Sequence, residues 1–84
     1  MTEPREIEDR LLAFLRREVF SPQVSVAEDT DLIAAGFDSL SLVRLLLIIE
    51  QTYGLWIPAR DITADTLRNV RTLAAVVSAL LHER

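Results

Sequence analysis

The sequence predicts an all-α fold, a small bundle of three main helices plus one short helix. Apolar residues recur at helical spacing in three separate segments, and no segment alternates in the way of a half-buried strand. The chain has 84 residues, enough for one small domain, and 50% of them are hydrophobic, which indicates a folded core. We therefore expect a single domain over residues 1–84, with its core between about residues 7 and 81 and its helices in an up-and-down arrangement.

The first helix is predicted over residues 4–18. Proline at position 4 suits a first turn, because its missing N–H would have no partner there. One apolar face is expected to be buried, formed by Ile7, Leu11, Phe14 and Leu15. The periodicity then fails over residues 19–37, which predicts a long loop with about one helical turn over residues 31–35. The loop is expected to reach the core through Val24, Val26, Leu32 and Ile33.

The second helix is predicted over residues 39–53, with Asp38 as its N-cap and Gly54 at its C-terminal stop. It carries two apolar stripes. The core stripe is Leu42, Leu45, Leu46, Ile49 and Tyr53. The second stripe, turned by roughly 100° or more, is Leu40, Val43 and Leu47. Two interpretations are open for it: the first loop folds over part of it, or it is an exposed patch that contacts other proteins.

Two further helices complete the predicted bundle. A short third helix is expected over residues 61–67. Asn69 is expected to cap the last helix. The buried face of that helix is predicted to be Val70, Leu73, Ala74, Val77, Leu80 and Leu81.

Composition excludes several classes of function. The net charge of −4 disfavours a nucleic-acid partner, because phosphate backbones need a basic patch. The chain has no cysteine, and its one histidine, His82, lies near the end, so neither a catalytic triad nor a metal site is expected. The longest apolar run, residues 45–49, is far shorter than a membrane span. We therefore expect a cytoplasmic monomer with no membrane or nucleic-acid contact.

Ser39 is the candidate site residue, because it lies where the first loop ends and the apolar second helix begins. Unpaired N–H groups and the positive end of the helix dipole favour an anion at such a position. A plain helix-start hydroxyl is the alternative, since serine is common there. A serine hydrolase is excluded, because no G-x-S-x-G elbow surrounds the residue.

Several motifs, in order along the chain, resemble those of the acyl and peptidyl carrier proteins, over about residues 7–81. They are Gly36-Phe37-Asp38-Ser39-Leu40-Ser41, with Asp29-Thr30-Asp31-Leu32 before it and Glu50-Gln51-Thr52-Tyr53-Gly54-Leu55, Ile57-Pro58, Asp61-Ile62-Thr63 and the run of residues 67–77 after it. The resemblance implies the acyl-carrier-like bundle. It also implies a 4′-phosphopantetheine arm from coenzyme A, joined to Ser39 by a phosphodiester, with Asp38 as the flanking motif residue.

The resemblance further implies that the arm's thiol holds acyl or aminoacyl intermediates as thioesters, and that the domain itself is not an enzyme. The implied partners are a phosphopantetheinyl transferase and the loading and downstream biosynthetic enzymes. The contact role falls on Leu40, Val43, Arg44 and Leu47. Because the chain begins with methionine and its ends lie close to the predicted bundle, we expect a free-standing carrier.

One feature departs from the carriers of bacterial fatty-acid synthesis, whose second helix is acidic. Between residues 39 and 53, the only charged residues are Arg44 and Glu50. Partners are therefore expected to rely on apolar contact more than on electrostatic steering. This favours a polyketide or nonribosomal-peptide type of pathway, such as antibiotic biosynthesis. The rival hypothesis is a small helical protein–protein interaction module that never carries a cofactor.

Overall fold

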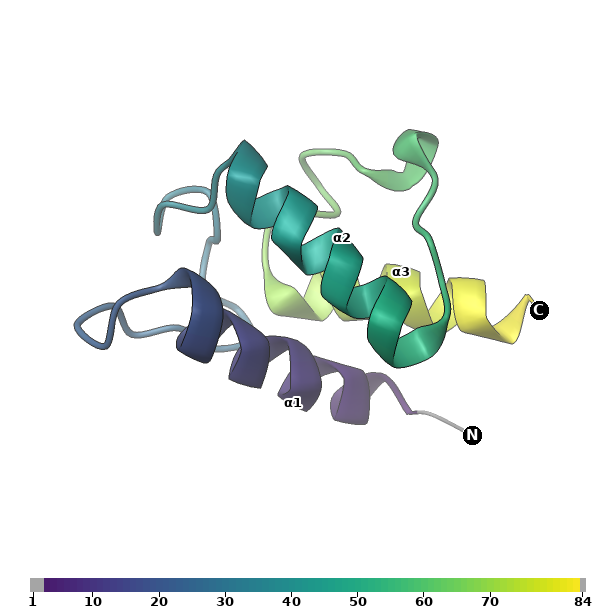
Figure 1. Ribbon diagram of the computed structural model, residues 1–84, viewed down its shortest axis with the longest axis horizontal. Helices are drawn as coiled ribbons and strands as arrows, with labels where there is room; N and C mark the ends of the chain where they lie inside the picture. The colour runs from purple at the N-terminus through teal and green to yellow at the C-terminus, as the bar shows by residue number, and fades with distance from the viewer. Residues whose placement is uncertain (1–2, 84) are drawn as a thin grey trace.

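A computed structural model describes residues 3–83, which form an all-helical domain (Figure 1). The helices are α1 (Pro4–Phe14), α2 (Ser39–Tyr53) and α3 (Val70–His82). A π-helical turn, Leu15–Val19, extends α1, and a 3-10 turn, Ala59–Asp61, lies between α2 and α3. Residues 3–83 contain no β-strand. The predicted fold class is thus confirmed.

The first and last helices pack against each other, and α2 lies across them (Figure 1). In Figure 1, α2 and α3 run in the same general direction and α1 runs the opposite way. This is the order of an up-and-down arrangement in which the short segment between α2 and α3 makes the returning step. The connection over residues 55–69 is long enough to carry the chain back to the level at which α2 began (Figure 1).

The first helix buries the predicted face and ends differently from the prediction. Ile7, Leu11, Phe14 and Leu15 are all buried. The regular helix stops at Phe14, and the predicted extension to residue 18 is a π-turn, in which the Phe20 N–H donates to the Leu15 carbonyl over 2.9 Å. The wider turn keeps both Leu15 and Phe20 in the core.

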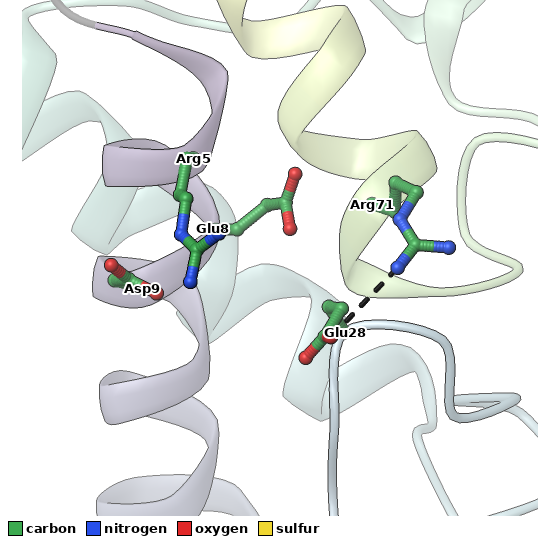
Figure 2. A pocket seen from close by; sticks show the side chains of 5 residues that line it. All are labelled: Arg5, Glu8, Asp9, Glu28 and Arg71. Atoms are coloured by element: carbon green, nitrogen blue, oxygen red, sulfur yellow. Dashed lines mark ion pairs between the residues drawn. The ribbon is translucent and has the colours of Figure 1, made fainter.

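Backbone hydrogen bonds and two arginines hold the long first loop. The Leu32 N–H donates to the Arg68 carbonyl, and the Arg71 N–H to the Glu28 carbonyl, each over 3.0 Å. The Arg71 guanidinium also lies 3.8 Å from the Glu28 carboxylate (Figure 2). The Arg16 guanidinium donates to the Val26 carbonyl over 3.1 and 2.6 Å. The loop is therefore fastened both to the π-turn that follows α1 and to the start of α3.

Three of the four predicted loop contacts reach the core. Val26 and Leu32 are buried, and Val24 packs against the core while partly exposed. Ile33 is 54% exposed, so its predicted core role is wrong. The reason is the predicted helical turn, which is present: the Ala35 N–H donates to the Asp31 carbonyl over 3.0 Å. Successive residues of such a turn point about 100° apart, so Leu32 faces inward and Ile33 outward.

The predicted third helix over residues 61–67 is wrong. The 3-10 turn ends at Asp61, and a single turn follows, in which the Leu67 N–H donates to the Thr63 carbonyl over 3.0 Å. Thr63 Oγ1 accepts from the Thr66 N–H, and Thr66 Oγ1 donates to the Asp61 carbonyl. Such side-chain bonds compete with the backbone ladder of a helix. They account for the irregular segment.

The caps of the two long helices follow the prediction. Asn69 Oδ1 accepts from the Thr72 N–H over 2.9 Å, and Thr72 Oγ1 accepts from the Asn69 N–H over 3.3 Å, which forms a capping box. Gly54 ends α2 in the left-handed conformation, with φ at 64°. On α3, Val70, Leu73, Ala74 and Val77 are buried, and Leu80 and Leu81 are partly so.

Truncation of adjacent leucines on α2 should separate its two stripes. Leu46 is 8% exposed and Leu47 is 47% exposed. We expect Leu46→Ala to lower the free energy of unfolding by roughly 2–5 kcal/mol, and Leu47→Ala by less than about 1 kcal/mol. Urea unfolding followed by circular dichroism measures both. Equal losses would mean that both faces of α2 contribute to the core.

Candidate functional site

The start of α2 is organised by Asp38. Its carboxylate accepts hydrogen bonds from the backbone N–H and from the hydroxyl of Ser41, each over 2.9 Å. Its carbonyl accepts from the Leu42 N–H over 2.9 Å. The backbone of Asp38 is extended, as an N-cap residue requires. The predicted N-cap is therefore confirmed, and it fixes where the helix begins.

A glycine turn delivers the chain to this cap. Gly36 has a φ of 111°, a conformation that residues with a Cβ rarely adopt, although a Cβ there would meet nothing within 4 Å. The requirement for glycine thus lies in the backbone angle and not in the available space. Phe37 follows with its side chain in the core, and its N–H donates to the Leu32 carbonyl over 2.9 Å. Residues 36–38 are therefore held by the buried side chain of Phe37 and by its backbone hydrogen bond to Leu32.

Ser39 is the first residue of α2, and it is exposed. Among the described residues, no hydrogen bond occupies its hydroxyl. Ser41, two residues later, is only partly exposed and donates its hydroxyl to Asp38. Of these two hydroxyls at the helix start, that of Ser39 is the one available to another molecule.

The electrostatics of the cap favour a charged Asp38. The hydrogen bond from the Ser41 N–H, and after it that from the Ser41 hydroxyl, lower the pKa of the Asp38 carboxyl below its ordinary value of 3.8. Asp38 is therefore ionised at neutral pH. Both of the hydrogen bonds that hold this charge come from Ser41 and neither from Ser39.

A hollow of about 210 Å³ lies beside Ser39 and is mostly apolar. It brings together residues from the first loop, the start of α2 and the segment before α3. The side chains that line it belong to Ile33, Phe37, Asp38, Ser39, Leu42 and Leu67. Sequence reasoning missed Ile33 and Leu67 as neighbours of the site. The positions of both depend on irregular turns, for which periodicity carries no signal.

The second stripe of α2 is exposed along its whole length. The exposed fractions are 68% for Leu40, 52% for Val43 and 47% for Leu47. The first loop does not fold over these side chains, so the interpretation in which it covers the stripe is wrong. The core stripe is placed as predicted, with Leu45, Leu46 and Ile49 buried. An exposed stripe of apolar side chains therefore begins next to Ser39.

Arg44 does not extend freely into solvent. Its guanidinium Nη1 donates to the Glu18 carbonyl over 3.1 Å, and Nη2 lies 3.8 Å from the Glu18 carboxylate. This contact joins α2 to the π-turn at the end of α1. Sequence reasoning gave no sign of it, because the two residues lie 26 positions apart.

A separate cleft of about 280 Å³ is lined by charged residues only: Arg5, Glu8 and Asp9 of α1, Glu28 of the loop and Arg71 of α3 (Figure 2). It shares no lining residue with the hollow at Ser39. Within residues 3–83, no group of three or more acidic or histidine side chains is placed to hold a metal ion. None of the described helices is both long enough and apolar enough to cross a membrane.

Comparison with protein families adds the decisive observation. The family model described as "Phosphopantetheine attachment site" matches residues 9–77, well over half of the chain. The chain belongs to the phosphopantetheine attachment-site family. The resemblance to acyl and peptidyl carrier proteins is thereby confirmed. A search of curated proteins found no match.

Members of this family carry 4′-phosphopantetheine covalently, so the predicted cofactor is confirmed. Carrier domains of the family are modified by a phosphopantetheinyl transferase, interact with biosynthetic enzymes and are not themselves catalytic. The start of α2 fits such a group. Ser39 offers an exposed hydroxyl at a helix N-terminus, where a phosphodiester is electrostatically favoured, and the adjoining hollow is apolar.

The lowered pKa of Asp38 predicts a specific pH effect on stability. Because the folded-state pKa lies below the unfolded one, the ionised carboxylate stabilises the folded state above about pH 4, and this contribution is lost as the pH falls through the folded-state pKa. Asp38→Asn keeps an oxygen acceptor at the cap but cannot titrate. We expect the stability difference between wild type and variant to shrink as the pH is lowered from about 6 to 2.

Urea unfolding at several pH values measures this difference, and the remaining carboxylates, common to both proteins, cancel from it. A difference that stayed constant across the range would show that the charge of Asp38 has no part in the cap.

Proposed function

We propose that this chain is a carrier domain whose Ser39 bears the 4′-phosphopantetheine arm, on which acyl or aminoacyl intermediates are held as thioesters and presented to biosynthetic enzymes. The observation that carries the proposal is the exposed, unengaged hydroxyl of Ser39 at the first residue of α2. The domain is proposed to comprise residues 1–84, with its core over about residues 7–81.

The local structure supports attachment at this serine. The hydroxyl oxygen of Ser39 forms a bond to the phosphorus that carries the pantetheine in coenzyme A, the pyrophosphate bond breaks and 3′,5′-ADP leaves, while the hydroxyl proton passes to a base on the transferase. The new phosphodiester lies at the N-terminus of a helix of 15 residues, whose first N–H groups and dipole stabilise its negative charge. Asp38 contributes by fixing the helix start and does not contact the reacting atoms.

The thiol of the arm supplies the thioester chemistry, and the chain supplies the tether. A tethered intermediate reaches each enzyme at high effective concentration, because its encounter becomes local. The proposed docking surface for the transferase and the later enzymes is formed by Leu40, Val43 and Leu47, with Arg44 beside them. This surface begins one residue after Ser39, so a docked enzyme lies close to the arm.

The composition of this surface favours one type of biosynthetic pathway over another. Its apolar, weakly charged character supports partners of the polyketide or nonribosomal-peptide type, as in antibiotic biosynthesis, over those of fatty-acid synthesis. We propose a monomer that works in the cytoplasm, without membrane or nucleic-acid partners. The net charge of −4 supports the last point.

The central test is the intact mass of the protein after incubation with coenzyme A and a broad-specificity phosphopantetheinyl transferase. We expect the wild type to gain one phosphopantetheine unit and Ser39→Ala to gain none. Ser39→Ala should remain folded and lose about 1 kcal/mol or less, because Asp38 still caps the helix. Ser41→Ala is the matched control and should load. A folded wild type that gains no mass would favour the interaction module without cofactor.

Transfer to Ser39 is also expected to depend weakly on salt. Exposed charges are screened over about 10 Å at 0.1 M ionic strength, so an electrostatically docked carrier loses association rate as salt rises. Docking through Leu40, Val43 and Leu47 does not lose rate in this way. The loading rate measured between about 0.05 and 0.5 M salt tests this. A steep fall would place the contact charges elsewhere, for example at Asp29, Asp31 or Asp61.

A further inference from the structure

Arg44 occupies the middle of the exposed stripe of α2. Leu40 lies four residues before it and Leu47 three residues after it, so both are its neighbours on the helix surface. Its side chain is 49% exposed. A partner that covers Leu40 and Leu47 therefore also covers part of this guanidinium.

Arg44 is paired with a carboxylate of the same chain. The Glu18 carboxylate lies 3.8 Å from Nη2 and is itself 41% exposed. The Glu18 carbonyl holds Nη1 over 3.1 Å. Arg17 shares the same carboxylate, with its Nε 3.1 Å from Oε2. Glu18 thus brings a negative charge from the π-turn after α1 to the edge of a surface built on α2.

We propose that Glu18 determines the specificity of the docking surface by masking the charge of Arg44, so that the surface fits a partner that is apolar and uncharged opposite Leu40, Arg44 and Leu47. The inference rests on the proposed function and adds a residue of the π-turn after α1 to the site. An unmasked guanidinium covered by an uncharged partner loses water without gaining a counter-charge, which weakens docking.

The two contacts of Arg44 allow a clean test. Glu18→Gln removes the carboxylate charge but leaves the carbonyl of residue 18, so Arg44 stays in place while its charge is unmasked. The same change also unmasks Arg17. The double variants Glu18→Gln/Arg44→Gln and Glu18→Gln/Arg17→Gln separate the two arginines. Glu6→Gln is the matched control, because it breaks an exposed 3.8 Å pair with Arg10 on α1 and changes the net charge equally.

The experiment measures kcat and KM for transfer from coenzyme A to each variant by a broad-specificity phosphopantetheinyl transferase, with the carrier as varied substrate. We expect Glu18→Gln to raise KM about two- to fivefold, the effect of one exposed ion pair, with kcat nearly unchanged. Adding Arg44→Gln should return KM toward the wild-type value, and adding Arg17→Gln should not. Glu6→Gln should behave as wild type. Unchanged melting temperatures show that the effects do not arise from unfolding.

Several results would overturn the inference. A lower KM for Glu18→Gln would mean that the partner presents an acidic group to Arg44. An unchanged KM would mean that the Glu18–Arg44 pair lies outside the contact with the partner. If adding Arg17→Gln restored KM and adding Arg44→Gln did not, the charge that Glu18 masks would be that of Arg17. A defect that vanished at about 0.5 M salt would indicate repulsion by a basic partner. A wild type that is never loaded would reject the proposed function itself, and this inference with it.

Discussion

The hydrogen bond from the Leu32 N–H to the Arg68 carbonyl is the contact on which the rest of the site depends. It ties the middle of the first loop to the residue just before the capping box of α3. Leu32 is fully buried, so the bond is shielded from competing water and is costly to leave unmade. With this point fixed, the turn that follows can expose Ile33, bury Phe37 and deliver the chain to Asp38 at a set position.

The regular parts of this molecule could be predicted, because each depends on a local signal. The bounds of α2 follow from an aspartate before an apolar run and a glycine after it, and the cap of α3 follows from Asn69. Ser39 could be singled out for the same reason, since its position is defined by the start of α2. The face of α2 that is exposed could not be decided from the pattern, because two complete stripes competed for one small core.

The parts that could not be predicted depend on contacts between distant segments or on side chains that compete with the backbone. The threonine bonds at residues 63 and 66 replace the expected third helix. Leu67 meets the hollow at Ser39 only because the segment before α3 returns to the start of α2. The pairing of Glu18 with Arg44 requires the π-turn at the end of α1, and no periodic pattern indicates a π-turn.

The fastening of the first loop also bears on the order of events during synthesis. Arg68 and Arg71, whose backbone groups hold Leu32 and Glu28, lie C-terminal to Ser39 and are therefore synthesised after it. A nascent chain that ends before them has the serine and the sequence of α2, but it lacks both bonds and the packing of α1 on α3. The loop that leads to Ser39 is therefore held in place only once α3 is available to pack on α1, so the position of the serine depends on residues that follow it in the chain.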